Sequence, residues 1–335
     1  MIQVRSRRRR ALLALLVALV AAVFTGTSVS PASAHPFQYV GKAKASSFCG
    51  IGSPSMFNSV SRLASSGSLS YARGTATVDR EPASTDTPAE VPASAKGKGG
   101  PNFKATVNVV FHIVTDGATG NVSDQAVADQ IMVMNLGYGG FEGGYNTGFK
   151  FKLIGITHSD NAAWFYAGPT TSAEREMKAA LHTGDASTLN IYSTTAGPYL
   201  GWAYFPSTYK TKPWIDGLVI DWASMVHTST QYAGRYDLGK TATHESGHWF
   251  GLYHVFQGGC NAKGDYVDDT PPQLIATRGC PEGQDSCPEA GIDSIHNYMD
   301  YSYDSCYNQF TAGQAARMQD QWLYYRANGG SFVGN

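Results

Sequence analysis

The sequence predicts an α/β (α+β) fold, in which a twisted mixed sheet is backed by helices and followed by an irregular C-terminal part. Two observations favour this class. Strand-like and helix-like segments alternate from residue 104 to residue 222, which is typical of a sheet with helices packed on it. After Gly258 the sequence is rich in Gly, Pro, Cys and Asp, which indicates long loops, and a helical segment follows at 311–327.

The expected strands are segments in which β-branched and aromatic residues concentrate. KATVNVVFHIV opens the series and FKFKLIGI follows it. STLNIYS and DGLVIDW have a similar composition and the length of ordinary strands. These four expected strands cover residues 104–114, 149–156, 187–193 and 216–222.

Two helices are expected between these strands. In SDQAVADQIMVMN, Val127, Ile131 and Met134 recur at i, i+4 and i+7, so their side chains share one helix face. Ser123 is placed to cap this helix, because a serine oxygen accepts a hydrogen bond from the free N–H groups of the first turn. AEREMKAALH, residues 173–182, is the second expected helix.

The first 34 residues have the order of a secretory signal peptide. MIQVRSRRRR is basic, ALLALLVALVAAVF is an uncharged run of 14 residues, and TGTSVSPASA supplies small residues with cleavage expected after Ala34. A membrane anchor is the alternative, but 14 helical residues span only about 21 Å of a hydrocarbon core that is roughly 30 Å thick. We therefore expect a secreted, extracellular protein that is not a membrane protein after cleavage. The adjacent arginines leave the export route open.

Composition divides the remaining chain. Residues 61–100 are rich in Ser, Ala, Thr, Pro and Gly and read as a mobile linker, because they bury too little apolar surface to order themselves. The expected organisation is a signal peptide at 1–34, a propeptide or stalk with linker at 35–100, and a folded domain at 101–335. The net charge of −1, without a basic stripe, excludes an electrostatic case for a nucleic-acid partner.

Export changes the interpretation of the cysteines. Outside the cell, the four that cluster near the C-terminus are expected to form two disulfides, and the spacing alone leaves three connectivities open. Cys49 stands apart from this cluster. The four clustered cysteines are Cys260, Cys280, Cys287 and Cys306.

The stretch HESGHWFGLYH predicts a metal site. His244 and His248 lie four residues apart, so a helix projects both imidazoles from one face, with Glu245 beside them. Gly251 ends this helix with a positive φ and turns His254 back toward the same ion. Three neutral nitrogens suit zinc and leave a fourth position for water. Bound zinc lowers the pKa of that water from about 15.7 to about 7, and Glu245 is placed to act as general base.

HExxHxxGxxH is the zinc signature of the metzincin metalloproteases, which also carry a methionine turn, supplied here by Met299 in SIHNYMDYS. LGKTATHESGHWFGLYHVFQGGC, GDYVDDTP, NYMDYS and FTAGQAARM resemble the pappalysin family, in its ulilysin-like branch of secreted endopeptidases. The resemblance covers residues 104–327. It implies a metzincin-type zincin with a five-stranded mixed sheet, active-site helices and a disulfide-linked C-terminal subdomain.

The resemblance also implies residue roles. His244, His248 and His254 would bind zinc, and Met299 would form the apolar floor of the site. Tyr301 would place its hydroxyl near the metal and stabilise the oxyanion, the alternative being a tyrosine that only packs in the turn. The cysteine order would pair Cys260 with Cys287 and Cys280 with Cys306.

Three further expectations rest on the same resemblance. The loop from Asp265 to Thr270 would bind calcium through oxygen ligands, as in some relatives, or be an ordinary acidic loop. An edge strand near Leu200–Ala203 would pair with extended protein or peptide substrates. An acidic residue within 303–305 would favour substrates with Arg or Lys, although the sequence does not say which side chain faces the pocket.

Cys49 lies in SSFCGIGSPS, which resembles the Cys-Gly segment in propeptides of ulilysin-like enzymes. The resemblance implies that its thiolate binds zinc in a latent precursor. A free thiol and an intermolecular disulfide are the alternatives. The predicted function is a secreted zinc metalloendopeptidase made as a zymogen. Its rivals are a catalytically inactive, zinc-containing binding module and another zinc hydrolase such as an amidase.

Overall fold

The computed structural model describes residues 70–73, 76–79, 90–261 and 264–330. The expected signal peptide and Cys49 lie outside the described residues. Strands β1 (Ser70–Arg73) and β2 (Ala76–Asp79) form an antiparallel hairpin of their own. Among the described residues, no helix is both long and apolar enough to span a bilayer.

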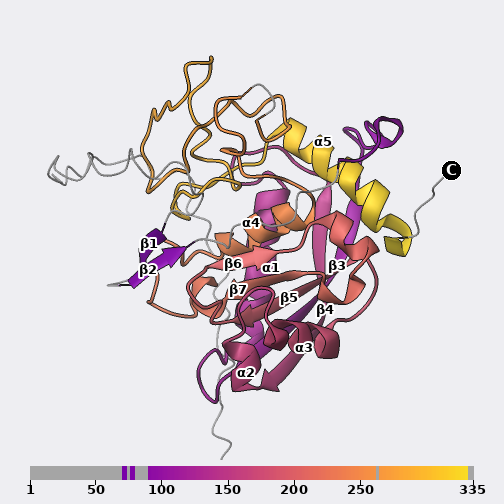
Figure 1. The fold of residues 1–335 in the computed structure, drawn as a ribbon, viewed down its shortest axis with the longest axis vertical. Helices are drawn as coiled ribbons and strands as arrows, with labels where there is room; N and C mark the ends of the chain where they lie inside the picture. Colours follow the sequence, from indigo (N-terminus) through magenta and orange to yellow (C-terminus); the bar gives the residue numbers. More distant parts are fainter. Residues whose placement is uncertain (1–69, 74–75, 80–89, 262–263, 331–335) are drawn as a thin grey trace, which may run out of the picture. The chain divides into compact units, whose positions relative to one another are not determined.

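A mixed five-stranded sheet forms the centre of the fold, with the order β4-β3-β5-β7-β6 (Figure 1). Four strands are parallel, and only β6 at one edge runs antiparallel to its neighbour β7. This confirms the predicted fold class, and four of the five strands lie where composition placed them. The strands are β3 (Ala105–Thr115), β4 (Phe149–Asp160), β5 (Thr188–Thr194), β6 (Gly201–Ala203) and β7 (Leu218–Asp221).

Alternate residues of the inner strands face two different helix layers. Ile191 of β5 and Leu218 of β7 join the main core, whereas Tyr192 and Val219 join a second cluster behind the sheet. Both faces are covered, so β5 and β7 are buried along their whole length, as is usual for parallel strands. Helices α1 (Asp124–Tyr138) and α4 (Lys240–Trp249) contribute to the main core, and α2 (Ala162–Phe165) and α3 (Ser172–Leu181) to the second cluster.

The predicted cap of α1 is present, and two further helices are capped in a similar way. Ser123 Oγ accepts a hydrogen bond from Ala126 N at 3.2 Å and begins α1. Thr171 does the same for α3, and Thr311 begins α5 with a capping box. Helix α5 (Ala312–Gln321) continues into a π-helical turn at Trp322–Arg326 and a 3₁₀ turn at Ala327–Gly330. Short 3₁₀ turns also occupy Ala93–Ala95, Pro206–Lys210, Pro213–Ile215 and Trp222–Ser224.

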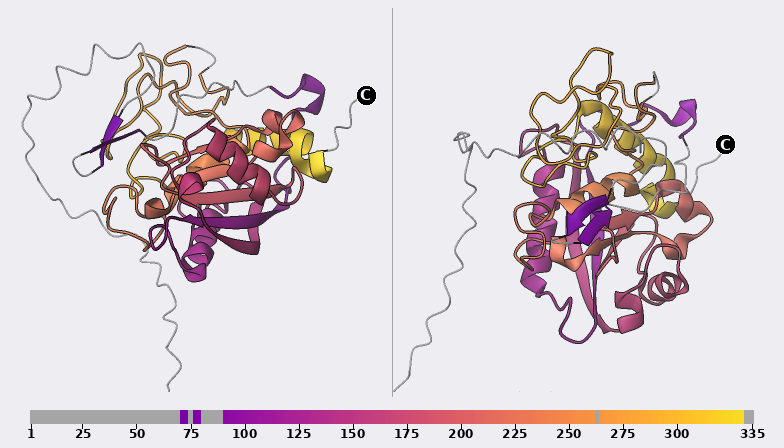
Figure 2. Two further views of the ribbon diagram at one scale, coloured as in Figure 1. Left: turned by 60° about the horizontal axis from the view of Figure 1, so that its bottom comes forward. Right: turned by 60° about the vertical axis from the view of Figure 1, so that its left-hand side comes forward.

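The segment between α4 and α5 is loop-rich, as predicted. Figures 1 and 2 show its orange loops gathered together near α5. Two disulfides join them, Cys260–Cys287 and Cys280–Cys306, the pairing that the family resemblance implies.

Packing against the domain begins before the expected boundary at residue 101. Val91 is buried, and the backbone N–H groups of Gly97 and Gly100 donate to side chains of α5, at 2.9 Å to Asp320 and 2.8 Å to Gln319. The segment is polar overall, and its order comes from these hydrogen bonds rather than from a core of its own. Contacts with α5 therefore begin within the last part of the stretch that composition assigned to the linker.

Candidate metal centre

Helix α4 carries HExxH and is buried along its entire length. Gly239, with φ of 75°, precedes it and offers no side-chain cap. Asp304 supplies the missing acceptor, because its Oδ2 accepts from Leu238 N at 2.9 Å and from Lys240 N at 3.3 Å. A carboxylate at this end also complements the positive end of the helix dipole. Asp304 therefore fixes the start of the helix that presents the histidines.

The three motif histidines converge on one point. Their Nε2 atoms lie 3.2 Å apart for His244 and His248, 3.3 Å for His244 and His254, and 3.1 Å for His248 and His254. His244 Nδ1 lies 2.5 Å from the carbonyl oxygen of Tyr298, and His248 Nδ1 lies 2.8 Å from that of Leu252. A carbonyl oxygen only accepts, so both Nδ1 atoms carry the proton and both Nε2 lone pairs face the shared point.

This donor set fits a tetrahedral metal ion. Zinc–nitrogen bonds of about 2.0–2.1 Å in tetrahedral geometry place the ligand nitrogens roughly 3.3–3.4 Å apart. The observed separations of 3.1–3.3 Å are close to this value. Nε2 lone pairs at such distances repel one another unless a cation lies between them. Imidazole nitrogen is also a ligand type that zinc favours.

The turn after α4 returns the third histidine as predicted. Gly251 has φ of +93°, and its N–H donates to His248 O at 2.8 Å. A Cβ at this position would also lie 2.7 Å from Cγ of Gln321, so glycine is required for space as well as for conformation. Leu252 N then donates to Gly247 O at 2.9 Å, which closes the turn that carries His254 to the metal centre.

Met299 lies beneath this centre. It is fully buried, and a Cβ on Gly247 would lie 2.3 Å from its Sδ, so the methionine packs directly on the glycine face of α4. The Tyr301 ring lies 4.9 Å from His254 and 5.9 Å from His244, centroid to centroid. The structure thus gathers Met299 and Tyr301 around the three histidines.

Glu245 is buried and lies against the edge strand β6. A Cβ on Gly201 would lie 2.9 Å from both Cγ and Oε1 of Glu245. Any larger residue at this first position of β6 would displace the carboxylate. Sequence reasoning missed Gly201, although a glycine inside a strand is a recognised signal of close approach by another group.

A buried carboxylate anchors the methionine turn to the loops. Asp300 accepts from Thr277 N at 2.9 Å, from Gln273 Nε2 at 2.9 Å and from Tyr301 N at 2.7 Å. The Thr277 hydroxyl donates to it as well. Burial raises the pKa of Asp300, and these donors oppose the shift. Asp300 therefore holds Tyr301 and the 273–277 loop together.

Two other side chains outside the predicted set support the histidines. Glu142 receives hydrogen bonds from Lys240 Nζ, at the start of α4, and from the Tyr298 hydroxyl. The carbonyl of Tyr298 is the partner of His244 Nδ1, so Glu142 connects both sides of that interaction. Arg317 of α5 donates from Nε to the carbonyl of Gly251 at 2.8 Å. Nothing in the local sequence around Glu142 or Arg317 marks these contacts.

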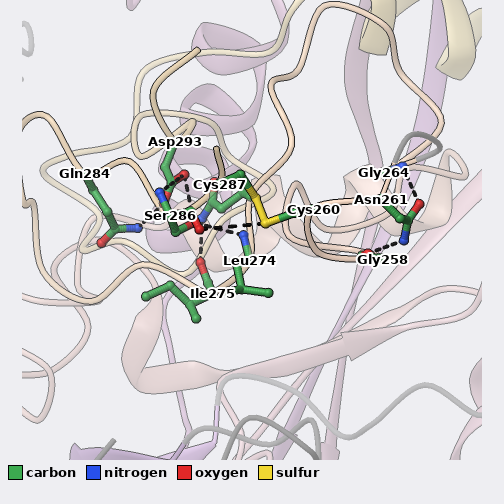
Figure 3. Close-up of a disulfide and its surroundings, with 11 residues drawn as sticks. Gly258, Cys260, Asn261, Gly264, Leu274, Ile275, Gln284, Ser286, Cys287 and Asp293 are labelled. Carbon is green, nitrogen blue, oxygen red and sulfur yellow. Dashed lines mark hydrogen bonds between the residues drawn. A yellow bond between two sulfur atoms is a disulfide. The ribbon is translucent and has the colours of Figure 1, made fainter. Parts of the chain in front are cut away.

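The first disulfide is surrounded by polar contacts (Figure 3). Ser286, next to Cys287, donates from N at 3.0 Å and from Oγ at 2.9 Å to Asp293 Oδ1. Its Oγ also accepts from Leu274 N at 2.9 Å. The bridge and these bonds together fix three separate stretches of the loop-rich segment.

The expected calcium loop contains a buried carboxylate. Asp265 Oδ1 accepts from Thr270 Oγ1 at 2.7 Å and from Val267 N at 3.1 Å. Asp265 Oδ2 is buried without a hydrogen-bond partner among the described residues. Burial raises the pKa of Asp265 to about 7.

The acidic residue in the 303–305 stretch has a defined place. Asp304 binds the start of α4, as described above, while the Tyr303 ring packs on Tyr236 with centroids 5.5 Å apart.

A helix that presents HExxH beneath a sheet edge, with a third histidine after a glycine turn, defines a metallopeptidase of the zincin class. Known proteins agree with this class. The family Peptidase_M43, described as pregnancy-associated plasma protein-A, matches residues 188–322. An extracellular metalloprotease of Arthroderma benhamiae is 44% identical over 229 residues, which make up 66% of this chain and 74% of the relative. One of Pyricularia oryzae is 44% identical over 247 residues, 71% of this chain and 83% of the relative.

Solved structures give the same picture. Mature mirolysin of Tannerella forsythia in complex with a cleaved peptide matches with a TM-score of 0.58 and 29% identity, covering 68% of this chain and 94% of that chain. Promirolysin of the same organism matches with a TM-score of 0.57 and 28% identity, covering 69% and 83%. The chain belongs to the pappalysin family, peptidase family M43. It is a metalloendopeptidase, and its substrates are peptides or proteins.

Proposed function

We propose that this chain is a secreted zinc metalloendopeptidase, in which His244, His248 and His254 hold the ion and Glu245 is the general base. The supporting observation is the set of three Nε2 atoms 3.1–3.3 Å apart, with two of the rings oriented by backbone carbonyls. When bound, zinc supplies a Lewis acid that polarises the reacting groups. Side chains of the protein carry out the proton transfer and stabilise the developing negative charge.

Glu245 is placed to move the proton. Its carboxylate lies beside β6, where a substrate peptide would lie, and is shielded from bulk water. It accepts a proton from the attacking water and delivers that proton to the nitrogen of the departing amine. The ring of Tyr301 lies beside His244 and His254. Its hydroxyl donates a hydrogen bond to the substrate oxygen that becomes negative as the carbonyl is attacked.

Strand β6 is the proposed docking edge for substrate. Within the described residues it ends the sheet, and its pairing with β7 uses only one of its two edges. An extended peptide added to the other edge would gain main-chain hydrogen bonds and pass alongside Glu245, which contacts Gly201. The likeness to mirolysin solved with a cleaved peptide supports a peptide as the ligand of this site.

We infer that the chain is exported and processed, with a signal peptide at 1–34 and a propeptide after it. The extracellular relatives and the likeness to a promirolysin support this organisation. In the precursor, the Cys49 thiolate would occupy the position that catalysis requires. An uncleaved precursor should therefore be silent, and its Cys49→Ser variant should be active. Equal activity of the two would remove Cys49 from the mechanism.

The buried carboxylate of Asp265 supports a second, structural ion. Asp265 and Thr270 would contribute oxygen ligands to calcium, and ionisation of Asp265 would then be stabilised by the cation. Calorimetric titration of the protein with calcium tests this part of the proposal. An unchanged heat signal in Asp265→Asn relative to the wild type would contradict it.

Metal analysis combined with an assay tests the central proposal. The processed protein should contain one zinc per chain, hydrolyse casein, lose this activity to phenanthroline and regain it on addition of zinc. Full casein hydrolysis by metal-stripped protein would contradict the proposal. Replacing His254 by alanine should abolish the zinc content while leaving the sheet intact by circular dichroism, because His254 lies outside α4 and contributes nothing to the sheet.

A further inference from the structure

Residues 90–100, here called the strap, bind the surface of α5. Gly97 N and Lys98 N donate to the two carboxylate oxygens of Asp320 at 2.9 and 3.1 Å, and Gly100 N donates to Gln319 Oε1 at 2.8 Å. The strap thus attaches by backbone donors to side chains more than two hundred residues away. This arrangement depends on the backbone of the strap and is not a chance contact of long side chains.

The first residue of the strap, Glu90, contacts Arg317, the arginine that binds the turn after α4. Glu90 Oε1 lies 2.7 Å from a terminal nitrogen of Arg317, whose side chain is 8% exposed. The same guanidinium donates from Nε to the carbonyl of Gly251 at 2.8 Å and lies 5.1 Å from the Tyr253 ring centroid. One arginine therefore contacts both Glu90 and the turn between His248 and His254.

The turn that Arg317 holds is directly connected to a metal ligand. Leu252, between the two residues that Arg317 contacts, accepts from His248 Nδ1 through its carbonyl at 2.8 Å. A shift of this turn would move both that acceptor and His254. Fixing the orientation of a ligand histidine through its second nitrogen is the usual way in which outer residues tune a metal site.

We propose that Glu90 is a positioning residue for the metal centre, and that the strap stays attached to the active enzyme. This proposal rests on the proposed function. Glu90 neutralises Arg317 and fixes its guanidinium, so that Nε stays on Gly251. Activation cleavage therefore falls on the N-terminal side of Glu90, before which the sequence reads REPASTDTPA at residues 80–89. The linker sequence places an activating cut within residues 73–104, and the attached strap restricts it to residues 73–89.

The first test compares Glu90→Ala and Glu90→Gln with a matched control, Lys96→Ala. Lys96 Nζ lies 3.3 Å from the other oxygen of Glu90 and is more than half exposed, so its removal leaves the Glu90–Arg317 contact intact. All proteins are full-length and carry Cys49→Ser, so that the proposed binding of zinc by the Cys49 thiolate does not affect the comparison. Zinc release to a chelator is measured at a temperature at which circular dichroism shows every variant folded.

Glu90→Ala should release zinc about 10-fold faster, the lower end of the range for groups that orient ligand histidines. It should lower kcat with little change in KM, because the strap binds α5 and acts on the turn that carries His254, whereas the proposed substrate edge is β6. Glu90→Gln should fall between Glu90→Ala and the wild type, and Lys96→Ala should match the wild type. Zinc release and kcat equal to wild type in Glu90→Ala would overturn the proposal.

Amide exchange separates this proposal from the proposed function. In metal-free protein, the backbone amides of residues 250–256 should exchange faster in Glu90→Ala than in Lys96→Ala, whatever the chemistry of the site. If the wild type neither bound zinc nor cut casein, the proposed function would fail. The exchange comparison would still test whether Glu90, through Arg317, holds the turn at Gly251. Unchanged exchange in Glu90→Ala would contradict the proposal that Glu90 positions this turn.

The second test cuts the chain on either side of the strap. A recognition sequence for a site-specific external protease is inserted between residues 85 and 86, or between residues 100 and 101. Each cut protein is compared with its own uncut form. Cutting at the first position should leave zinc release unchanged, and cutting at the second should accelerate it. Unchanged zinc release after both cuts would show that the strap is dispensable, and acceleration after both would show that residues before the strap are needed too; either result would overturn the proposal.

Discussion

The two halves of the described domain are held together in different ways. From β3 to α4, alternate apolar residues bury a sheet between helices, and backbone hydrogen bonds run along regular elements. From Gly251 to Phe310 no helix or strand is present among the described residues. There, two disulfides and buried carboxylates hold the chain together, with Asp300 accepting hydrogen bonds from the 273–277 loop and Asp293 from Ser286.

The metal centre lies where these halves meet, and each supplies part of it. The regular half contributes His244, Glu245 and His248 on a rigid helix. The loop-rich half contributes His254, the methionine turn and the carbonyl that orients His244. A rigid helix fixes the spacing of two ligands, and cross-linked loops allow side chains from distant points of the sequence to converge on them. Perturbing the two halves should therefore have different consequences.

The largest effect is expected at the junction itself. Glu245→Ala removes the proposed base without removing a metal ligand, so turnover should fall by roughly 10²- to 10⁴-fold while zinc content stays unchanged. Casein hydrolysis and metal analysis on the same sample measure both quantities. Gly201→Ala is a companion variant, because its Cβ would meet the Glu245 carboxylate at 2.9 Å and the carbonyl oxygen of Val219 in β7 at 2.7 Å, and activity should fall there as well. Wild-type turnover in Glu245→Ala would contradict the assigned mechanism.

The next largest effect is expected from removing a disulfide of the loop-rich half. Replacing Cys260 and Cys287 by alanine opens a closed loop with a sequence separation of 27, for which chain entropy gives about 3–4 kcal/mol of lost stability. The loss should appear in urea unfolding of a Cys49→Ser background, which prevents thiol exchange. Amide exchange should rise in residues 255–295 and stay constant in β3 and β5. Uniform acceleration across both halves would show that they do not unfold separately.

The sequence predicted local features better than contacts between distant segments, for a physical reason. The Ser123 cap and the Gly251 turn depend on residues within one or two turns of themselves, so local pattern specifies them. The contacts of Asp304 with Lys240, of Arg317 with Gly251 and of Gly201 with Glu245 join segments whose proximity only the folded chain reveals. Spacing left three disulfide pairings open, and the observed pairing matches the one implied by the family resemblance.

A pH change should act on the regular half through one buried histidine. His112 in β3 lies 3.0 Å from Asn190 Oδ1 and 2.8 Å from Thr157 Oγ1, and it is fully buried. Burial lowers the pKa of His112 from 6.5 to about 4. Between these values the unfolded chain binds a proton that the folded chain does not, so stability falls as pH decreases through this window.

The expected size is about 2 kcal/mol between pH 7 and pH 5. Urea unfolding at both pH values measures it, with the same metal content in each sample. His112→Asn should be less stable at pH 7, where it lacks the packing on Tyr192, yet lose about 2 kcal/mol less than the wild type on acidification. An identical pH dependence in the two proteins would show that another group carries the acid sensitivity.

The smallest effect is expected far from the metal and inside the regular half. Ser123→Ala removes the oxygen that accepts from Ala126 N at 3.2 Å and should cost about 1 kcal/mol, the usual value for a lost helix cap. Ser123→Asp keeps an acceptor and adds a charge that favours a helix N-terminus, so its stability should match or exceed that of the wild type. Zinc release should remain at the wild-type rate in both variants, because the hydrogen bonds of α1 with α4 come from Gln130 and Tyr138, beyond the first turn that Ser123 caps. Faster zinc release in Ser123→Ala would mean that α4 shifts when α1 is destabilised. The proposal that the regular half supplies a rigid ligand helix would then be wrong.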